Sequence, residues 1–148
     1  MNFIIFATFI IFTSILSMTI KRHNRSEKNQ QEQFWEREKR ANQVRRKPLD
    51  DLDYVTIPLE NLPTAVLAED VIVQDCLNTL VSLSREKIVN LAGYTNTDLK
   101  LTYGTANITA LSQYDQNFTL LALTLQKWAD TLHNAGYMAE TRQILEYA

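Results

Sequence analysis

The chain has 148 residues, of which 45% are hydrophobic and 22% are charged, and its formal net charge is only −2. This balance excludes a fully disordered chain and a protein that is basic throughout, as a general nucleic-acid binder would be. Three Gly, three Pro, one Cys and two His also exclude a collagen-like chain, a disulfide-stapled domain and the common zinc sites built from Cys and His.

An uninterrupted apolar run opens the sequence. Residues 3–20 read FIIFATFIIFTSILSMTI and contain no charge, Gly or Pro. As a helix, this run would be roughly 27 Å long, close to the ~30 Å of hydrocarbon in a bilayer. We therefore predict a transmembrane anchor over residues 1–20. The alternative is a cleaved signal peptide, but no basic residue precedes the run, and Ser14 and Ser17 form a poor cleavage site.

The charges that flank the apolar run predict its orientation. Four Lys or Arg residues lie in 21–28 and none precedes the run. Because Lys and Arg remain on the cytoplasmic side of a membrane, we expect a single-pass cell-membrane protein with its N-terminus outside and its C-terminal part in the cytoplasm. Cys76 would then be reduced. Glycosylation sequons would carry no glycan there; they begin at Asn24, Asn107 and Asn117.

Residues 21–47 are predicted to continue the helix as a basic stalk. Helix-forming Lys, Arg, Glu and Gln dominate the segment, and no Gly or Pro interrupts it before Pro48. It holds ten basic and four acidic residues. Such a stalk could contact anionic lipid headgroups, although the plainer interpretation is a solvated helix that only fixes topology. Nucleic-acid binding is the weakest interpretation, because Phe34 and Trp35 are the only aromatic residues in the stalk.

Residues 48–68 are predicted to form an extended linker. Pro48 ends the helix, because the residue before a proline is displaced from the α region. Val55, Ile57 and Leu59 then alternate with more polar residues, which is the period of an extended chain. This segment either packs against its own domain or serves as a docking peptide for another protein.

The remaining residues, 69–148, are predicted to form a small helical domain. Asp70 is a plausible N-cap for a helix that runs to about Leu83, in which Cys76 acts as a small hydrophobic residue. A second helix start is predicted at Thr95, because Thr95–Asp98 reads Thr-Asn-Thr-Asp, the pattern of a capping box. Gly104 supplies the stop of that helix.

The strongest pattern of the domain is a helical hairpin over residues 113–148. Residues 112–115 again read as a helix start, and apolar residues then recur at intervals of three and four. Leu120 and Leu123 widen this stripe, which predicts burial on more than one side. Gly136 ends the first helix, and a second helix follows with a stripe of its own; this second stripe is Met138, Thr141, Ile144, Leu145 and Ala148.

The hairpin resembles a tetratricopeptide repeat, a family of 34-residue helix pairs. The matching positions are Leu125, Trp128, Ala129 and Leu132 in the first helix, Gly136 in the turn, and Thr141, Leu145 and Ala148 in the second. Leu132 stands where the family usually has an aromatic residue, and the usual proline would fall beyond Ala148. The whole layout, with its blocks LDDLDYVTIPLENLP and NLAGYTNTDLKLTYG, resembles uncharacterised bacterial single-pass membrane proteins.

One repeat cannot bury both of its faces. The helices in 70–103 could cover one face, a partner could cover it, or the chain could be a shortened form of a longer repeat protein. We expect the helices in 70–103 to cover one face, with a partner contributing to the coverage.

These features predict a membrane-anchored adaptor or scaffold that binds a protein partner and carries out no catalysis. The resemblance implies recognition by the helical hairpin. We expect the lipid bilayer and an unidentified protein as partners, and no nucleic acid, small-molecule substrate, cofactor or metal. The candidate partner-binding residues are polar ones in the hairpin: Asn117, Lys127, Asn134 and Gln143.

Two other functions remain open. One is a small structural subunit of a membrane protein complex, for which the anchor offers only Ala7 and Ser14 as a small-residue face. The other, less favoured, is a membrane-surface enzyme. Its candidate catalytic residues would be His133 with Asp130, or the carboxylates of Asp50, Asp51 and Asp53. These three carboxylates could bind a divalent cation, but the loop lacks the remaining ligands of such a site.

Overall fold

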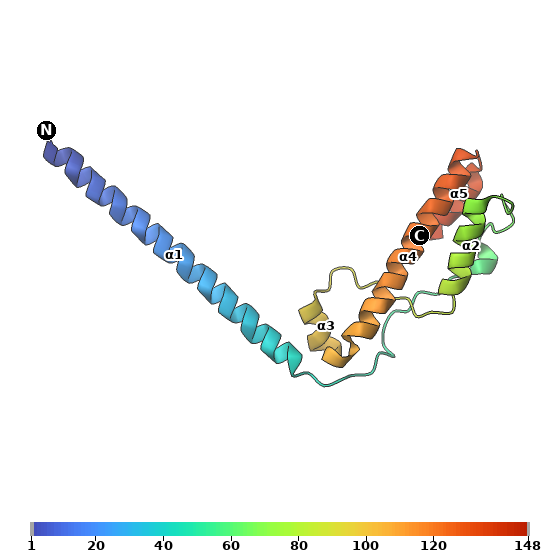
Figure 1. Cartoon of the computed structure of the whole chain (residues 1–148), viewed down its shortest axis with the longest axis horizontal. Helices are drawn as coiled ribbons and strands as arrows, with labels where there is room; N and C mark the ends of the chain where they lie inside the picture. Colours follow the sequence, from blue (N-terminus) through green and yellow to red (C-terminus); the bar gives the residue numbers. More distant parts are fainter. Residues whose placement is uncertain (1, 148) are drawn as a thin grey trace.

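The computed structural model describes residues 2–147; the side chains of Asn2, Ile4, Ile5, Asn24 and Ser26 lie outside the described ones. Over these residues the chain is all-α, as predicted, with a single antiparallel bridge between Tyr54 and Val89. The elements in chain order are α1 (Asn2–Asn42), the 3-10 helix η1 (Leu59–Asn61), α2 (Val71–Leu83), α3 (Asn96–Tyr103), the 3-10 helix η2 (Thr105–Asn107), α4 (Ile108–Asn134) and α5 (Met138–Tyr147) (Figure 1).

Helix α1 is a 41-residue rod that stands away from the other helices and meets α3 at its C-terminal end (Figure 1). At 1.5 Å per residue it is roughly 60 Å long. The apolar run and most of the stalk therefore form one continuous helix. Among the described side chains, which do not include Ile4 and Ile5, no helix is both long enough and apolar enough to cross a membrane. The span over residues 3–20 stays a prediction.

The end of α1 differs from the prediction. The helix stops at Asn42 rather than at Lys47, because the chain turns there to pack against α3 and η2. Ala41 is fully buried, and the Lys47 N–H donates to the Tyr103 carbonyl at 3.0 Å. Contacts that are distant in sequence thus end the helix five residues before Lys47.

Asn107 fixes this turn. Its side chain is fully buried, and its amide nitrogen donates to the carbonyls of Lys47 and Tyr103 at 2.7 and 2.8 Å. Its Oδ1 accepts from the Arg46 guanidinium at 3.0 Å. A buried amide with every polar atom bonded holds its neighbours in one arrangement. Asn107 therefore ties residues 46–47 to the end of α3.

Gly104 permits the close approach of the two segments. Its φ of 87° and ψ of 150° lie in a region that is essentially restricted to glycine, and a Cβ would lie 2.4 Å from the Arg45 carbonyl oxygen. We expect Gly104→Ala to lower the free energy of unfolding by roughly 2–4 kcal/mol in a denaturant titration.

Gly93→Ala is the matched control for Gly104→Ala. Gly93 has a nearly identical φ of 88°, but nothing lies within 4 Å of a Cβ there. We expect it to cost about 1 kcal/mol, from backbone strain alone. Equal destabilisation by the two substitutions would contradict the close contact between Gly104 and Arg45.

Two hydrophobic cores hold the domain together. The larger lies among α2, α4 and α5, and its buried members include Leu80, Leu125, Trp128 and Ile144. The smaller joins α3 to the start of α4 through residues such as Leu99 and Leu111. Because α4 contributes to both cores, it is the central element of the domain.

The predicted start signals hold for α2 and α3. The Asp70 carboxylate accepts hydrogen bonds from the backbone N–H groups of Ile72 and Val73. Thr95 and Asp98 form a reciprocal capping box, and Gly104 is the C-cap of α3. Each of these signals acts within four residues, so it is readable from the sequence alone.

The predicted start of α4 is wrong. The helix begins at Ile108, before Ser112. Asp115 caps no helix; its Oδ1 accepts a hydrogen bond from the backbone N–H of Leu91 at 3.1 Å. The carboxylate thus holds the loop between α2 and α3 against α4, so the local capping pattern serves a contact with a distant part of the chain.

The turn between α4 and α5 is confirmed at Gly136, whose φ is 87°. Its N–H donates to His133, and the Tyr137 N–H donates to Leu132; together these bonds form a Schellman motif. The predicted stripe of α5 is only partly buried, because Met138 and Leu145 are exposed. Ala148, the last position of that stripe, lies outside the described residues.

Residues 48–68 lie against their own domain, the first of the two predicted alternatives. Ile57 and Leu62 are buried in the larger core, and the Val55 N–H donates to the Ile88 carbonyl at 2.9 Å. The Tyr147 hydroxyl donates to the Thr56 carbonyl at 2.9 Å. The segment therefore covers one side of the helices rather than lying free for a partner.

Candidate interaction surfaces

The four candidate partner-binding residues do not lie on one surface. Asn117 is only 7% exposed; its amide nitrogen donates to the Lys87 carbonyl, and its Oδ1 accepts from Gln113. The prediction for Asn117 is therefore wrong, because its side chain is used inside the fold. Gln143 donates to the Asn61 carbonyl at 2.6 Å. Only Lys127 and Asn134 lie on the same surface.

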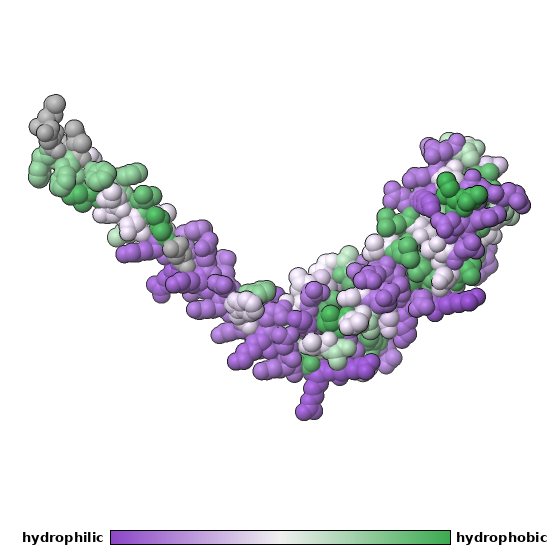
Figure 2. Space-filling model, in the orientation of Figure 1, coloured by the Kyte–Doolittle hydropathy of each residue, from purple (hydrophilic) through white to green (hydrophobic). Residues whose placement is uncertain are grey.

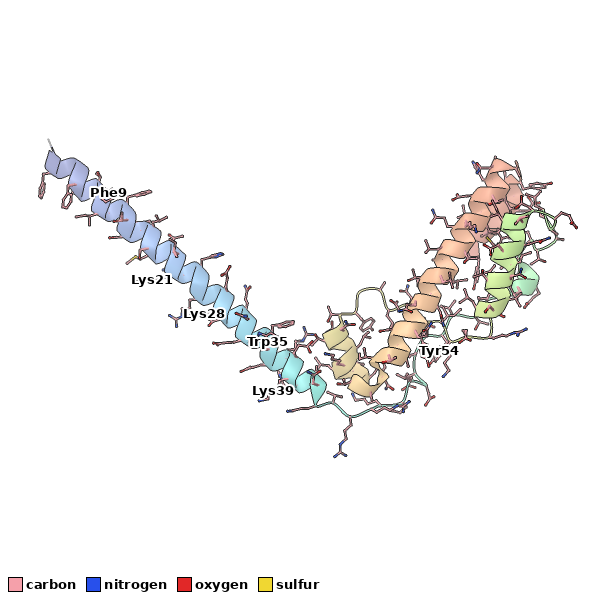
Figure 3. The ribbon with its side chains drawn as sticks, in the orientation of Figure 1. Phe9, Lys21, Lys28, Trp35, Lys39 and Tyr54 are labelled. Carbon is pink, nitrogen blue, oxygen red and sulfur yellow. The ribbon has the colours of Figure 1, made fainter. Side chains whose placement is uncertain are left out.

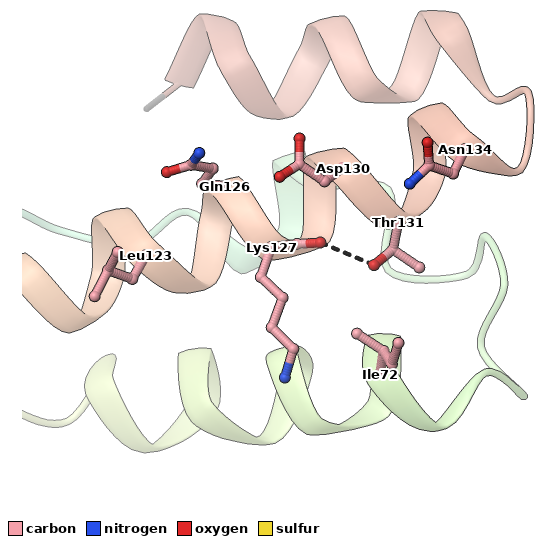
Figure 4. Close-up of a pocket in the computed structure, with 7 residues that line it drawn as sticks. All are labelled: Ile72, Leu123, Gln126, Lys127, Asp130, Thr131 and Asn134. Atoms are coloured by element: carbon pink, nitrogen blue, oxygen red, sulfur yellow. Dashed lines mark hydrogen bonds between the residues drawn. The ribbon is translucent and has the colours of Figure 1, made fainter.

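That surface is a hollow of about 430 Å³ between α2 and α4, formed by Ile72, Leu123, Gln126, Lys127, Asp130, Thr131 and Asn134. Figure 4 shows α4 between α5 and α2, with Lys127 reaching across the hollow toward α2. Its ammonium donates to the Asp75 carboxylate at 2.8 Å. This bond to Asp75 raises the pKa of Lys127 above its ordinary value, and the ion pair bridges the two helices.

Exposed apolar side chains surround this ion pair. Leu123 is 59% exposed and Leu120 46%, and Ile72 approaches from α2. The sequence predicted Leu120 and Leu123 as buried, which is wrong. Helix α2 covers an adjacent strip of α4 and leaves these two leucines in solvent. We refer to Ile72, Leu120, Leu123 and Lys127 as the α2/α4 face.

A second surface is the N-terminal half of α1. Its described large apolar side chains are all exposed, up to 82% at Phe3. In Figure 2 the part of α1 next to its grey tip is largely apolar, while the following part is hydrophilic. In Figure 3, Phe9, Lys21 and Lys28 project from the rod with no other element beside them. Monomeric soluble proteins rarely expose so large an apolar patch, so the described side chains of the apolar run form a candidate contact surface.

Charge is divided unevenly along the chain. Residues 21–47 hold ten basic and four acidic residues, whereas residues 48–148 hold five basic and thirteen acidic ones. The small net charge of the whole chain therefore conceals a basic rod joined to an acidic domain. Of the thirteen acidic residues in 48–148, three are grouped at Asp50, Asp51 and Asp53, and the others are dispersed along the sequence.

Polar contacts join the rod to the domain. The Glu38 carboxylate accepts from the Lys100 ammonium at 2.8 Å and from the Thr97 hydroxyl. These two bonds lower the pKa of Glu38. Asp98 accepts from the Thr95 hydroxyl and N–H and also faces Arg37; these contacts lower the pKa of Asp98.

Acidification is expected to loosen this junction. A carboxylate whose pKa is lowered by these contacts stabilises the attachment of α1 to α3 at every pH above its ordinary pKa of about 4. This stabilisation is lost as the pH falls through the lowered pKa. We expect amide exchange in residues 38–47, corrected for its intrinsic rate, to accelerate several-fold between about pH 5 and pH 3. Glu38→Gln is expected to accelerate it already at pH 7.

Glu36→Gln is the control for the junction, since Glu36 is exposed and makes neither bond of Glu38. Its exchange profile at pH 7 is expected to match that of the unaltered chain. Exchange in residues 38–47 that does not respond to pH or to Glu38→Gln would contradict the assigned role of the carboxylates.

Among the described side chains, no three His, Cys, Asp or Glu residues lie close enough together to share a metal ion. Cys76 is buried in the larger core, and this desolvation raises the pKa of its thiol. A raised pKa disfavours the reactive thiolate, so Cys76 acts as a small hydrophobic residue, as predicted.

The chain matches no protein-family model, no curated protein and no solved structure. The resemblance of residues 113–148 to a tetratricopeptide repeat therefore stays a prediction.

Proposed function

We propose that this chain is a membrane-anchored protein-interaction module. Residues 3–20 span a bilayer with the N-terminus outside, and the rest of α1 carries the helical domain on the cytoplasmic side. The hairpin of α4 and α5 acts as a single tetratricopeptide-like unit, and the α2/α4 face binds a protein partner.

The observation that carries this proposal is the exposure of the apolar residues in the first half of α1. These side chains have no described contact with the domain, whose own apolar residues fill two separate cores. Burial of apolar surface is worth about 25 cal/mol per Å². A lipid bilayer supplies this burial for a helix of this length without any change in the domain.

The rest of α1 favours a spacer role. From Lys21 to Asn42 the helix rises by roughly 30 Å, and its last turn is fixed to α3 by buried Ala41 and by the bonds of Glu38. Such a rod would hold the domain at a defined distance from the membrane. The α2/α4 face would then remain open to large partners.

The α2/α4 face is suited to an apolar helix of a partner. Leu120 and Leu123 on α4 and Ile72 on α2 line an apolar groove. The ion pair of Lys127 with Asp75 lies within this groove. An amphipathic helix binds by laying its apolar face into such a groove, with polar contacts beside the apolar ones.

Two measurements test the proposal on the full chain. Membranes that contain it are washed with alkaline carbonate, and we expect the protein to stay in the pellet. A photo-crosslinking amino acid at position 123 is then expected to yield one discrete adduct, whereas the same probe at exposed Gln33 yields none of that mass. Loss to the carbonate wash would contradict the anchor, and identical adducts at both positions would contradict the α2/α4 face.

A further inference from the structure

Four basic residues occupy the first two turns of α1 after the apolar run: Lys21, Arg22, Arg25 and Lys28. All four side chains are exposed. Among the described side chains none of them forms an ion pair, and the only pair in this part of the helix joins His23 to Glu27 at 3.1 Å. Four positive charges are thus directed outward with no carboxylate assigned to them.

The four residues lie within a length of helix that is close to the distance over which the charge of a membrane surface acts. Lys21 and Lys28 are separated by roughly 10 Å along the helix, and the Debye length at physiological ionic strength is about 8 Å. With residues 3–20 in the bilayer, all four charges lie at the level of the headgroups. The later exposed cations, beginning with Arg37, lie roughly 24 Å or more beyond Lys21, outside this range.

The side-chain types also suit phosphate. Arg22 and Arg25 carry planar guanidinium groups that bind phosphate oxygens in a bidentate manner, and the two lysines act as compact point charges. The domain offers no comparable basic surface, since residues 48–148 contain thirteen acidic and five basic residues. Six more basic residues lie in 37–47, beyond the reach of the membrane surface. Attraction to an anionic bilayer therefore acts through residues 21–28.

We propose that Lys21, Arg22, Arg25 and Lys28 form a binding site for the headgroups of anionic phospholipids in the leaflet that faces the domain. This proposal rests on the proposed function, because the apolar run must be in the bilayer for these residues to reach the headgroups. It adds a lipid preference to the anchor: the chain gathers anionic lipid around itself and is held more firmly in bilayers that contain it.

The test is lipid selectivity of the full chain reconstituted in vesicles, measured by electron paramagnetic resonance of spin-labelled lipids. Spin-labelled phosphatidylserine is compared with spin-labelled phosphatidylcholine in the motionally restricted shell around the protein. A single basic residue near an anionic membrane surface raises the affinity for it about fivefold. We therefore expect at least a several-fold preference for phosphatidylserine, which 1 M NaCl largely removes.

Two charge-matched variants locate the site. The quadruple variant K21Q/R22Q/R25Q/K28Q is expected to bind both spin-labelled lipids equally. The variant K39Q/R40Q/R45Q/K47Q removes the same charge from exposed positions farther along the chain and is expected to keep the preference. Equal binding of both lipids by the unaltered chain, or loss of the preference in the second variant alone, would overturn the proposal.

Failure of the proposed function gives a different signal. If the chain does not enter the bilayer, no motionally restricted lipid is seen at all; if it enters without lipid preference, only the present inference fails. Nucleic acid is the competing ligand for these charges. Binding of a fluorescent 20-nucleotide RNA that requires the same four residues, without any preference for phosphatidylserine, would assign them to nucleic acid and overturn the lipid site.

Discussion

Replacing Ile10 and Ile15 together by lysine is expected to move the protein from the membrane pellet to the soluble fraction. A lysine at the centre of a spanning helix costs about 2.5–3.5 kcal/mol, and the isoleucine that it replaces contributes about 0.3–0.6 kcal/mol to insertion. The double substitution thus disfavours insertion by about 6–8 kcal/mol. The measurement is the protein's distribution between pellet and supernatant after a carbonate wash.

Gln31→Lys with Gln33→Lys provides the control. Both glutamines are exposed on the same helix, beyond the apolar run, and the substitution adds the same charge without placing it in lipid. This variant is expected to stay in the pellet. Equal retention of the two double variants would show that residues 3–20 are not surrounded by lipid, and the anchor would have to be abandoned.

Replacing Trp128 by alanine is expected to destabilise the domain more than any other single truncation in it. Trp128 is the largest fully buried side chain and lies in the core that joins α2, α4 and α5. Truncation of a buried tryptophan to alanine costs about 3–5 kcal/mol, a large part of the ~5–15 kcal/mol by which domains are stable. Urea denaturation followed by circular dichroism measures the change.

Two further variants define what Trp128 contributes. Its indole Nε1 is buried and has no hydrogen-bond partner among the described atoms, so Trp128→Phe removes an unsatisfied donor while it keeps an aromatic ring. We expect a cost well below that of alanine. Leu123→Ala, on the exposed side of the same helix, is expected to change stability by less than about 0.5 kcal/mol. Similar losses from Trp128→Ala and Leu123→Ala would refute the assigned core.

Signals that act over a few residues predicted parts of the fold well. The cap at Asp70, the capping box at Thr95 and the left-handed turn at Gly136 each rest on hydrogen bonds within five residues along the chain. Helical periodicity also identified Trp128 and Leu125 as core positions. These features need no knowledge of which helix packs on which.

The errors concern contacts between distant segments. Helix α1 ends early because residues 41–47 pack on α3, and the residue that holds them, Asn107, carries no local signal for this role. Leu120 and Leu123 were assigned to the core because of helical periodicity. Periodicity shows which side of a helix is apolar, but it does not show how much of that side the neighbouring helices cover. Asn117 was proposed as a contact residue because it is polar, although its amide nitrogen donates to the Lys87 carbonyl and its side chain is buried.

The orientation of α1 in living cells tests the central claim most directly. One cysteine reporter at a time is added on either side of the apolar run, Asn2→Cys or Gln33→Cys, and cells are treated with a maleimide that does not cross membranes. Cys76 adds little background, because it is buried and desolvation raises the pKa of its thiol. We predict labelling at position 2 in intact cells, and at position 33 only after the membrane is opened. Labelling at position 33 in intact cells would contradict the account.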